Sequence, residues 1–287
     1  MLTDIKLFMT SSPMGAYRST AAPDFKGLNP ANGMVKELQS YWRPDSRCLL
    51  VSAFPDEYGI NDRMRADFER IFRETGLSVK CMDICDRREG KTVISRLDEY
   101  DMVVLGGGHV PTQKQFFDEI GLREALEGWD GIVMGISAGS MNCADVVYAQ
   151  PEMPGEATEP SYQKFIRGLG LTDVNVLPHY QAVKDDYVDG LRLFEEITYP
   201  DSAGRIFYAI VDGSYVLQTK DRKEIRGEAY RIADGKIRKI CEAGEVCNIS
   251  WRFLHVFGEN RKRTFAPSDR RGSPFICRKT AATGSVR

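Results

Sequence analysis

The chain has 287 residues, which is enough for one large domain with a sizeable core or for two small ones. Its 39 Lys and Arg residues nearly balance its 41 Asp and Glu residues, so no nucleic acid held by counterion release is expected as a partner. Apolar runs stay well short of the roughly 20 residues that cross a bilayer, and charged residues at positions 4 and 6 interrupt the start, so we expect a cytoplasmic protein without a membrane segment.

The first two hundred residues alternate short apolar runs, rich in β-branched residues, with amphipathic stretches. This is the pattern of βαβ units. Several runs are continuously apolar, as expected of strands that are covered on both faces, so we predict an α/β fold with a largely parallel central sheet. The predicted strands are residues 5–10, 47–53, 77–83, 102–105, 131–135 and 174–177.

One covering helix is predicted between the second and third of these strands. The apolar residues at positions 64, 68, 71 and 72 follow helical spacing, and the pattern stops at Gly76, which is typical of a left-handed C-terminal cap.

After residue 205 the pattern changes to short alternating runs at 206–210, 214–217, 229–232 and 236–240. The pairs Asp212-Gly213 and Asp234-Gly235 separate them, and such pairs favour tight hairpin turns. We therefore predict antiparallel hairpins that extend one edge of a catalytic domain spanning residues 1–240. Residues 241–287 are predicted to be a C-terminal extension that is partly disordered, because periodicity fades there and its last part is basic.

The strongest local motif is G-x-S-x-G at residues 135–139, which follows an apolar strand and precedes helix-compatible residues. This is the context of a nucleophile elbow, in which Ser137 would stand above the carboxyl ends of the strands. Small residues are needed at Gly135 and Gly139 because strand and helix approach closely. A phosphate-binding loop is the alternative for such a turn, but neither a Gly-Lys-Ser/Thr nor a dinucleotide motif is present.

A serine hydroxyl needs a base, and the chain has only three His residues, at positions 109, 179 and 255. His179 follows the predicted strand 174–177 and would share the rim with Ser137, so it is the predicted base. The glycines at 106–108 end another strand at this rim. The amides of Gly107 or Gly108, with that of Ala138, could bind the oxyanion of a tetrahedral intermediate. A simple tight turn is the alternative for these glycines.

The acid that would orient the imidazole is not fixed by spacing alone. The acids within plausible reach are Asp145, Glu152, Glu156, Glu159, Asp173, Asp185 and Asp186.

Several motifs in the same order resemble the peptidase E and cyanophycinase family, serine peptidases with a class I glutamine amidotransferase-like fold. The resemblance covers about the first 240 residues. The matching segments are residues 7–12, 106–108, 135–140, 152–154, 168–171 and 178–179. It implies a three-layer sandwich in which Ser137 is the nucleophile and His179 the base. By its place before Met-Pro, Glu152 would be the orienting acid.

The resemblance also implies hydrolysis of peptide or isopeptide bonds after aspartyl residues through an acyl-enzyme, without metal or organic cofactor. The candidates to bind an aspartyl side chain are His109, Gln113 and Arg167. Two departures separate the chain from the dipeptidase branch: Glu152 stands where that branch has Asp, and His109 where it usually has Asn. The substrate therefore stays open between a dipeptide, a longer peptide and a β-linked polymer, and a homodimer is compatible with the pattern.

Other functions are also compatible with parts of the pattern. A glutamine amidotransferase would need Cys at the elbow, where this chain has Ser137. A conventional α/β-hydrolase esterase usually places its His much later in the chain. A non-catalytic protein that holds a small ligand on the same fold is the alternative from another class. The seven scattered Cys residues favour reduced thiols and indicate neither a disulfide framework nor a zinc site.

Overall fold

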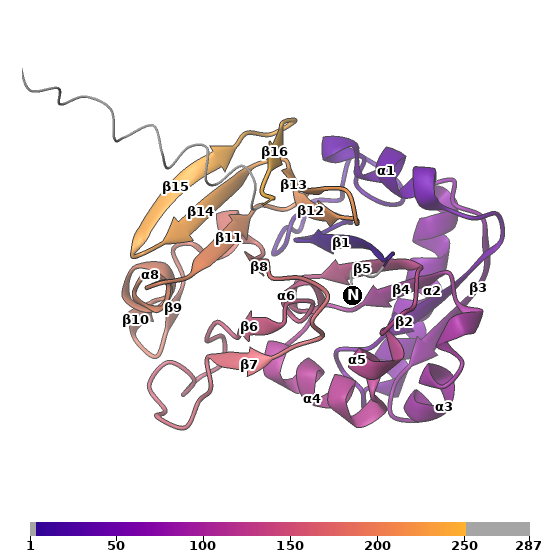
Figure 1. Cartoon of the computed structure of the whole chain (residues 1–287), viewed down its shortest axis with the longest axis horizontal. Helices are drawn as coiled ribbons and strands as arrows, with labels where there is room; N and C mark the ends of the chain where they lie inside the picture. Colours follow the sequence, from indigo (N-terminus) through magenta and orange to yellow (C-terminus); the bar gives the residue numbers. More distant parts are fainter. Residues whose placement is uncertain (1–3, 251–287) are drawn as a thin grey trace, which may run out of the picture. The chain divides into compact units, whose positions relative to one another are not determined.

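The central sheet has eight strands in the order β16-β13-β12-β1-β5-β4-β2-β3 (Figure 1). It is seen in a computed structural model that describes residues 4–250. Strands β1 to β5 pair in parallel, and β12, β13 and β16 continue the sheet in antiparallel fashion beside β1. The strands are β1 (Lys6–Thr10), β2 (Ser46–Val51), β3 (Val79–Cys85), β4 (Met102–Leu105), β5 (Ile132–Ile136), β12 (Tyr215–Gln218), β13 (Lys223–Arg226) and β16 (Val246–Asn248). The predicted, largely parallel sheet is confirmed.

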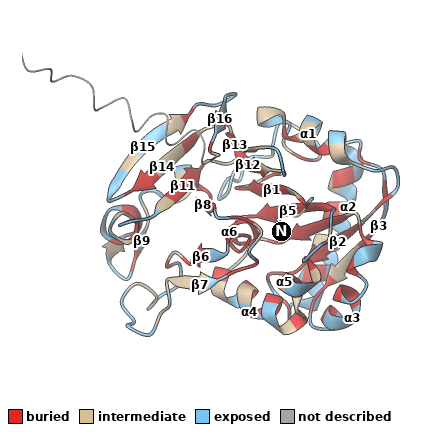
Figure 2. Ribbon diagram, viewed as in Figure 1, coloured by how far each residue is buried: buried red, intermediate tan, exposed pale blue. Residues whose placement is uncertain are grey.

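Helices cover both faces of this sheet, which explains the continuous apolar runs of its inner strands (Figure 2). Helices α1 (Met34–Tyr41) and α2 (Tyr58–Glu74) share one core cluster with Phe8 of β1, whereas its neighbours Leu7 and Met9 belong to the cluster on the opposite face. That second cluster includes side chains from α3 (Gly90–Ile94) and α4 (Val110–Ile120). Alternate side chains of a strand point to opposite faces, so the sheet forms the middle layer of a three-layer sandwich.

Helix α2 confirms the helix that was predicted after strand 47–53. Phe68 and Phe72 are buried against the sheet. The helix is followed by Gly76 with φ of +80°, and the N–H of Leu77 donates to the carbonyl of Phe72 at 3.0 Å. The glycine therefore ends this helix in a left-handed conformation, as the sequence predicts.

A second sheet has the order β15-β14-β11-β8. Its strands are β8 (Asn175–Leu177), β11 (Ile206–Ile210), β14 (Ala229–Ala233) and β15 (Lys236–Cys241). Strand β8 pairs in parallel with β11. The predicted strand at 174–177 therefore exists but does not join the central sheet, because an apolar run shows that a strand is buried and not which strand it pairs with.

The two Asp-Gly pairs have different roles. Asp234 and Gly235 both have positive φ, of 48° and 75°, and join β14 to β15 in the predicted hairpin. Asp212 and Gly213 instead connect β11 of the second sheet to β12 of the central sheet. The hairpin prediction at Asp212-Gly213 was wrong, since a local turn signal does not reveal that the chain crosses between sheets.

Smaller elements complete the described part of the chain. The short strands are β6 (Val146–Tyr148), β7 (Phe165–Arg167), β9 (Tyr187–Val188) and β10 (Leu191–Arg192). The short helices are η1 (Ala31–Gly33), η2 (Leu97–Glu99), α5 (Leu122–Ala125), α6 (Ala138–Met141), α7 (Tyr180–Val183), the π-helix η3 (Leu193–Thr198) and α8 (Tyr199–Asp201).

The central sheet includes residues beyond the boundary predicted at 240, because β16 pairs with β13. The rest of the predicted extension, residues 251–287 with His255, lies outside the described residues. Within residues 4–250, no helix has the length and apolar character needed to cross a membrane.

Candidate active site

Ser137 occupies a strained turn between β5 and α6, with φ of 51° and ψ of −116°. Its N–H donates to the carbonyl of Thr10 at 3.1 Å, which fixes the turn to strand β1. A Cβ atom at Gly139 would lie 2.3 Å from the carbonyl oxygen of Leu105, and one at Gly135 would lie 2.6 Å from the Cα atom of Ser140. Only glycine fits at these two positions, so the sequence produces the sharp turn expected of a nucleophile elbow.

His179 follows β8 and brings its imidazole to Ser137. Its Nε2 atom lies 2.9 Å from Ser137 Oγ, and its Nδ1 atom lies 2.7 Å from Oδ1 of Asp212. When Nδ1–H donates to the carboxylate, Nε2 is free to accept the hydroxyl proton of Ser137. The three side chains therefore form one hydrogen-bonded relay, with an exposed fraction of only 11% for the His179 side chain and 7% for that of Asp212.

Asp212 is held by further donors. The hydroxyl of Ser11 donates to Oδ1, and the backbone N–H of Tyr17 and the side-chain amide of Gln181 donate to Oδ2, each at 2.6 Å. Burial alone raises the pKa of a carboxyl group, but the hydrogen bonds from His179, Ser11 and Tyr17 outweigh it, so the pKa of Asp212 is lowered. The carboxylate thus stays ionised beside the imidazole.

The structure places Asp212, and not Glu152, against His179. The carboxylate of Glu152 makes no hydrogen bond to another described residue, although the residue lines the same cavity. Neighbouring protein atoms partly desolvate this carboxyl group and the carboxylate of Glu156 lies nearby, so its pKa is raised even though the residue as a whole is exposed. The orienting role expected for Glu152 therefore has no geometric support.

The sequence pattern predicts a turn at Asp212 and not a contact with His179. Asp212 lies two residues after the strand at 206–210, as His179 lies two residues after its strand, and that shared position was the available signal. The glycine at position 213 favoured a turn instead. Because an Asp in a turn and an Asp that contacts a distant histidine look alike in sequence, only the fold distinguishes them.

The predicted oxyanion donors lie beside Ser137. A Cβ atom at Gly107 would be 3.3 Å from the Cβ atom of Ser137, and Gly108 and Ala138 line the cavity. Within the described residues the amides of Gly107 and Gly108 have no hydrogen-bond acceptor. Ala138 begins α6, where the N–H group has no acceptor within the helix. These amides are therefore available to a negatively charged oxygen.

The three residues that were expected to contact an aspartyl side chain do not line the cavity. His109 contacts Glu156 at 2.7 Å and Thr112 at 2.8 Å. Gln113 is fully buried and donates to the carbonyl of Gly106, and Arg167 is exposed on β7. Their polar groups therefore support the loops around the site or face solvent.

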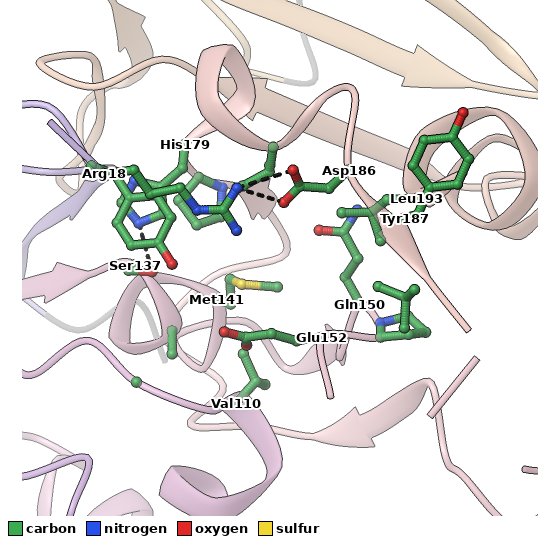
Figure 3. Close-up of a pocket in the computed structure, with 17 residues that line it drawn as sticks. Arg18, Val110, Ser137, Met141, Gln150, Glu152, His179, Asp186, Tyr187 and Leu193 are labelled. Carbon is green, nitrogen blue, oxygen red and sulfur yellow. Dashed lines mark hydrogen bonds and ion pairs between the residues drawn. The ribbon is translucent and has the colours of Figure 1, made fainter. Parts of the chain in front are cut away.

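The cavity in front of Ser137 measures about 180 Å³. Its charged lining residues, apart from His179, are Arg18, Glu152 and Asp186 (Figure 3). Arg18 comes from the irregular segment between β1 and α1, where the sequence has no motif that marks it. Within residues 4–250, no group of three or more His, Cys, Asp and Glu side chains has an arrangement that could hold a metal ion.

An α/β fold with a serine hydroxyl at an elbow, facing a histidine that contacts a carboxylate, has the arrangement of a serine-type hydrolase. The family model of peptidase family S51 matches residues 56–226, which is more than half of the chain. The chain therefore belongs to peptidase family S51 and is a serine-type peptidase, in agreement with the resemblance found in its sequence.

The fold is also similar to a solved structure, that of a candidate peptidase E protein from Listeria monocytogenes EGD-e. The two chains are 14% identical, with a TM-score of 0.51, and the similarity covers 82% of this chain and 98% of the other. At this identity the comparison supports the fold. No curated protein matched the sequence.

Proposed function

We propose that this serine peptidase uses Ser137 as nucleophile, His179 as general base and Asp212 as the acid that orients the imidazole. The observation that carries the proposal is the relay of hydrogen bonds from Ser137 Oγ to His179 at 2.9 Å and from His179 to Asp212 at 2.7 Å. A serine hydroxyl is a poor nucleophile unless a positioned base takes its proton, and this relay supplies both the base and the group that orients it.

The mechanism follows from these contacts. Ser137 attacks the scissile carbonyl while Nε2 of His179 accepts its proton, and Asp212 stabilises the imidazolium. The amides of Gly107, Gly108 and Ala138 are the proposed donors to the tetrahedral oxyanion. His179 then gives the proton to the leaving amine, and water releases the acyl group from Ser137 by the reverse sequence of proton transfers.

The proposed substrates are peptide or isopeptide bonds on the carbonyl side of aspartyl residues. The family resemblance suggests this preference, and a guanidinium among the residues that line the cavity supports it, since a substrate carboxylate needs a cationic partner in a confined site. A cavity of about 180 Å³ is below the roughly 300 Å³ at the lower end for drug-sized ligands, which favours a small substrate group at this position.

Ser137→Ala tests the nucleophile. We expect the wild-type protein to react with a fluorophosphonate at one site per chain and to hydrolyse aspartyl peptides. The variant should do neither, because Ser137 is the only described residue whose hydroxyl is hydrogen-bonded to His179 Nε2. Mass spectrometry of the labelled protein and a peptide-cleavage assay provide the two measurements. Equal turnover by wild type and Ser137→Ala would exclude Ser137 as the nucleophile.

A further inference from the structure

Residues 11–30 form a segment, here called the N-terminal strap, that joins β1 to η1 without helix or strand. The ring of Tyr17 stacks on the imidazole of His179, with centroids 4.2 Å apart, and the backbone N–H of Tyr17 donates to Asp212. These two contacts fix the strap to the His179–Asp212 pair. The position of the strap relative to the candidate catalytic groups is therefore set by its contacts with His179 and Asp212.

Arg18 follows Tyr17 and carries its guanidinium into the cavity (Figure 3). Its Nη1 atom lies 3.0 Å from Oδ1 and 2.8 Å from Oδ2 of Asp186, and it also contacts the carbonyl of Ala182 at 3.4 Å. The backbone of Arg18 has φ of 61°, a left-handed conformation that a non-glycine residue adopts only at a cost. Ser137 and His179 are the other non-glycine residues of the cavity lining with positive φ.

We propose that Arg18 binds the carboxylate of the substrate's acidic side chain. When no substrate is bound, Asp186 forms the ion pair with the Arg18 guanidinium instead. The proposal rests on the aspartyl preference stated above and names the residues that produce it. The substrate carboxylate would replace Asp186, and the aspartate would turn towards solvent. Neither residue belongs to the relay of Ser137, His179 and Asp212, and Arg18 lies outside the segment that matches the family model.

The exchange is physically easy because the resting ion pair is partly exposed. The exposed fraction is 52% for the Arg18 side chain and 30% for that of Asp186, and ion pairs with this exposure contribute little to stability. A guanidinium offers several N–H donors in one plane, which suits a substrate carboxylate in two-point contact. The pair therefore holds Arg18 in place without binding it strongly.

The charges around the cavity make Arg18 necessary for an acidic substrate. Among the described residues that line it, Arg18 is the only Lys or Arg, whereas Glu152 and Asp186 both contribute carboxyl groups. Without the guanidinium, two carboxyl groups would repel an aspartyl side chain. Asp186 also competes with the substrate for Arg18, so it should weaken the binding of acidic substrates in the wild-type protein.

The test compares an Asp-X dipeptide with its Asn-X analogue, which has nearly the same shape but no charge. Wild type, Arg18→Met, Asp186→Asn and the control Arg192→Met are assayed for kcat and KM on both peptides, and for labelling of Ser137 by a neutral fluorophosphonate. Arg192 is a matched control because its side chain is 51% exposed, pairs with one carboxylate, that of Glu196, and does not line the cavity.

For Arg18→Met we expect the Asp/Asn ratio of kcat/KM to fall by on the order of 100-fold or more, because a charge-assisted two-point contact is lost. The labelling rate should stay within about threefold of wild type. Asp186→Asn should lower KM for Asp-X several-fold and leave KM for Asn-X unchanged. Arg192→Met should change neither ratio nor KM.

An unchanged Asp/Asn ratio in Arg18→Met, with normal labelling, would overturn the proposal, and so would an unchanged KM of Asp186→Asn for Asp-X. The Asp186→Asn variant keeps the test valid even if the Arg18→Met protein does not fold. Failure of the proposed function has a different signature, because wild-type protein would then not label at Ser137, or would label and cleave neither peptide.

Discussion

At the scale of single residues, the contact between His179 and Asp212 joins positions 33 apart in the chain. Glu152 lies closer to Ser137 in sequence and is the orienting acid that the resemblance predicts, yet its carboxylate is not hydrogen-bonded to the imidazole. Their surroundings shift the pKa values of the two carboxyl groups in opposite directions. Hydrogen-bond donors around Asp212 lower its pKa, whereas desolvation by neighbouring protein atoms and the nearby carboxylate of Glu156 raise the pKa of Glu152.

The variants Asp212→Asn and Glu152→Gln distinguish the two acids. Asn at position 212 can donate to Nδ1 of His179, which favours the tautomer with a proton on Nε2, so the imidazole can no longer accept from Ser137. We expect kcat to fall on the order of 1,000-fold to 10,000-fold. Glu152→Gln should cost less than about tenfold, because no hydrogen bond to His179 is lost.

Steady-state kinetics at neutral pH is the appropriate measurement, since the lowered pKa keeps Asp212 ionised there. Circular dichroism of both variants serves as the control for folding. A larger loss for Glu152→Gln than for Asp212→Asn would show that the orienting acid had been assigned to the wrong residue.

At the scale of elements, the elbow depends on the close contact between β5, α6 and β4. Gly139 faces the backbone carbonyl of Leu105, and neither partner is a flexible side-chain end that could move away. Gly135 meets the backbone of Ser140 in the same way. The local sequence therefore determines not only the turn but also the distance between the strand and the helix that follows it.

Gly139→Ala should reduce the free energy of unfolding by about 2 kcal/mol or more, because the added methyl group overlaps backbone atoms. Gly59→Ala is the control. Gly59 is the second residue of helix α2, where a Cβ atom has only the end of Arg63 within 4 Å, so this change should not destabilise the protein. Urea unfolding measures both, and equal effects would contradict the packing argument.

At the scale of the whole described fold, the site is assembled from two sheets. Ser137 follows β5 of the central sheet and His179 follows β8 of the second sheet. Asp212 lies on the connection from β11 of the second sheet to β12 of the central sheet. The second sheet is anchored by buried aromatic residues, among them Phe207 of β11, which stacks on Tyr148 with ring centroids 4.4 Å apart. The position of His179 relative to Ser137 therefore depends on how well this sheet is packed.

Phe207→Ala should lower the free energy of unfolding by about 3 to 5 kcal/mol, the usual range for a fully buried Phe. It should also slow fluorophosphonate labelling of Ser137, because Phe207 pairs with Asn175 of β8, the strand that carries His179. Val146→Ala, at a side chain that is 53% exposed, is the control and should cost less than about 1 kcal/mol. Labelling at the wild-type rate despite the loss of stability would show that the second sheet does not position the base.

Features that depend on local chemistry could be predicted from the residues alone. The apolar runs predicted the parallel strands β1 to β5 of the central sheet, and Gly76 predicted the end of α2. The spacing of Gly135 and Gly139 predicted the elbow at Ser137. The position of His179 at the end of an apolar strand also followed from local pattern, and the resemblance to peptidase E agrees with the family match. These features are set by periodicity and steric constraints within about ten residues, which a single sequence displays.

Contacts between residues that are distant in the chain could not be predicted in this way and are seen only in the folded protein. The fold placed β8 beside β11 instead of in the central sheet, brought Asp212 rather than Glu152 to His179, and directed Arg18 from an irregular segment into the cavity. A carboxylate after a strand and an arginine in a loop look the same in sequence whether or not they reach a site. Their roles depend on strand pairing and chain crossing, which local periodicity does not encode.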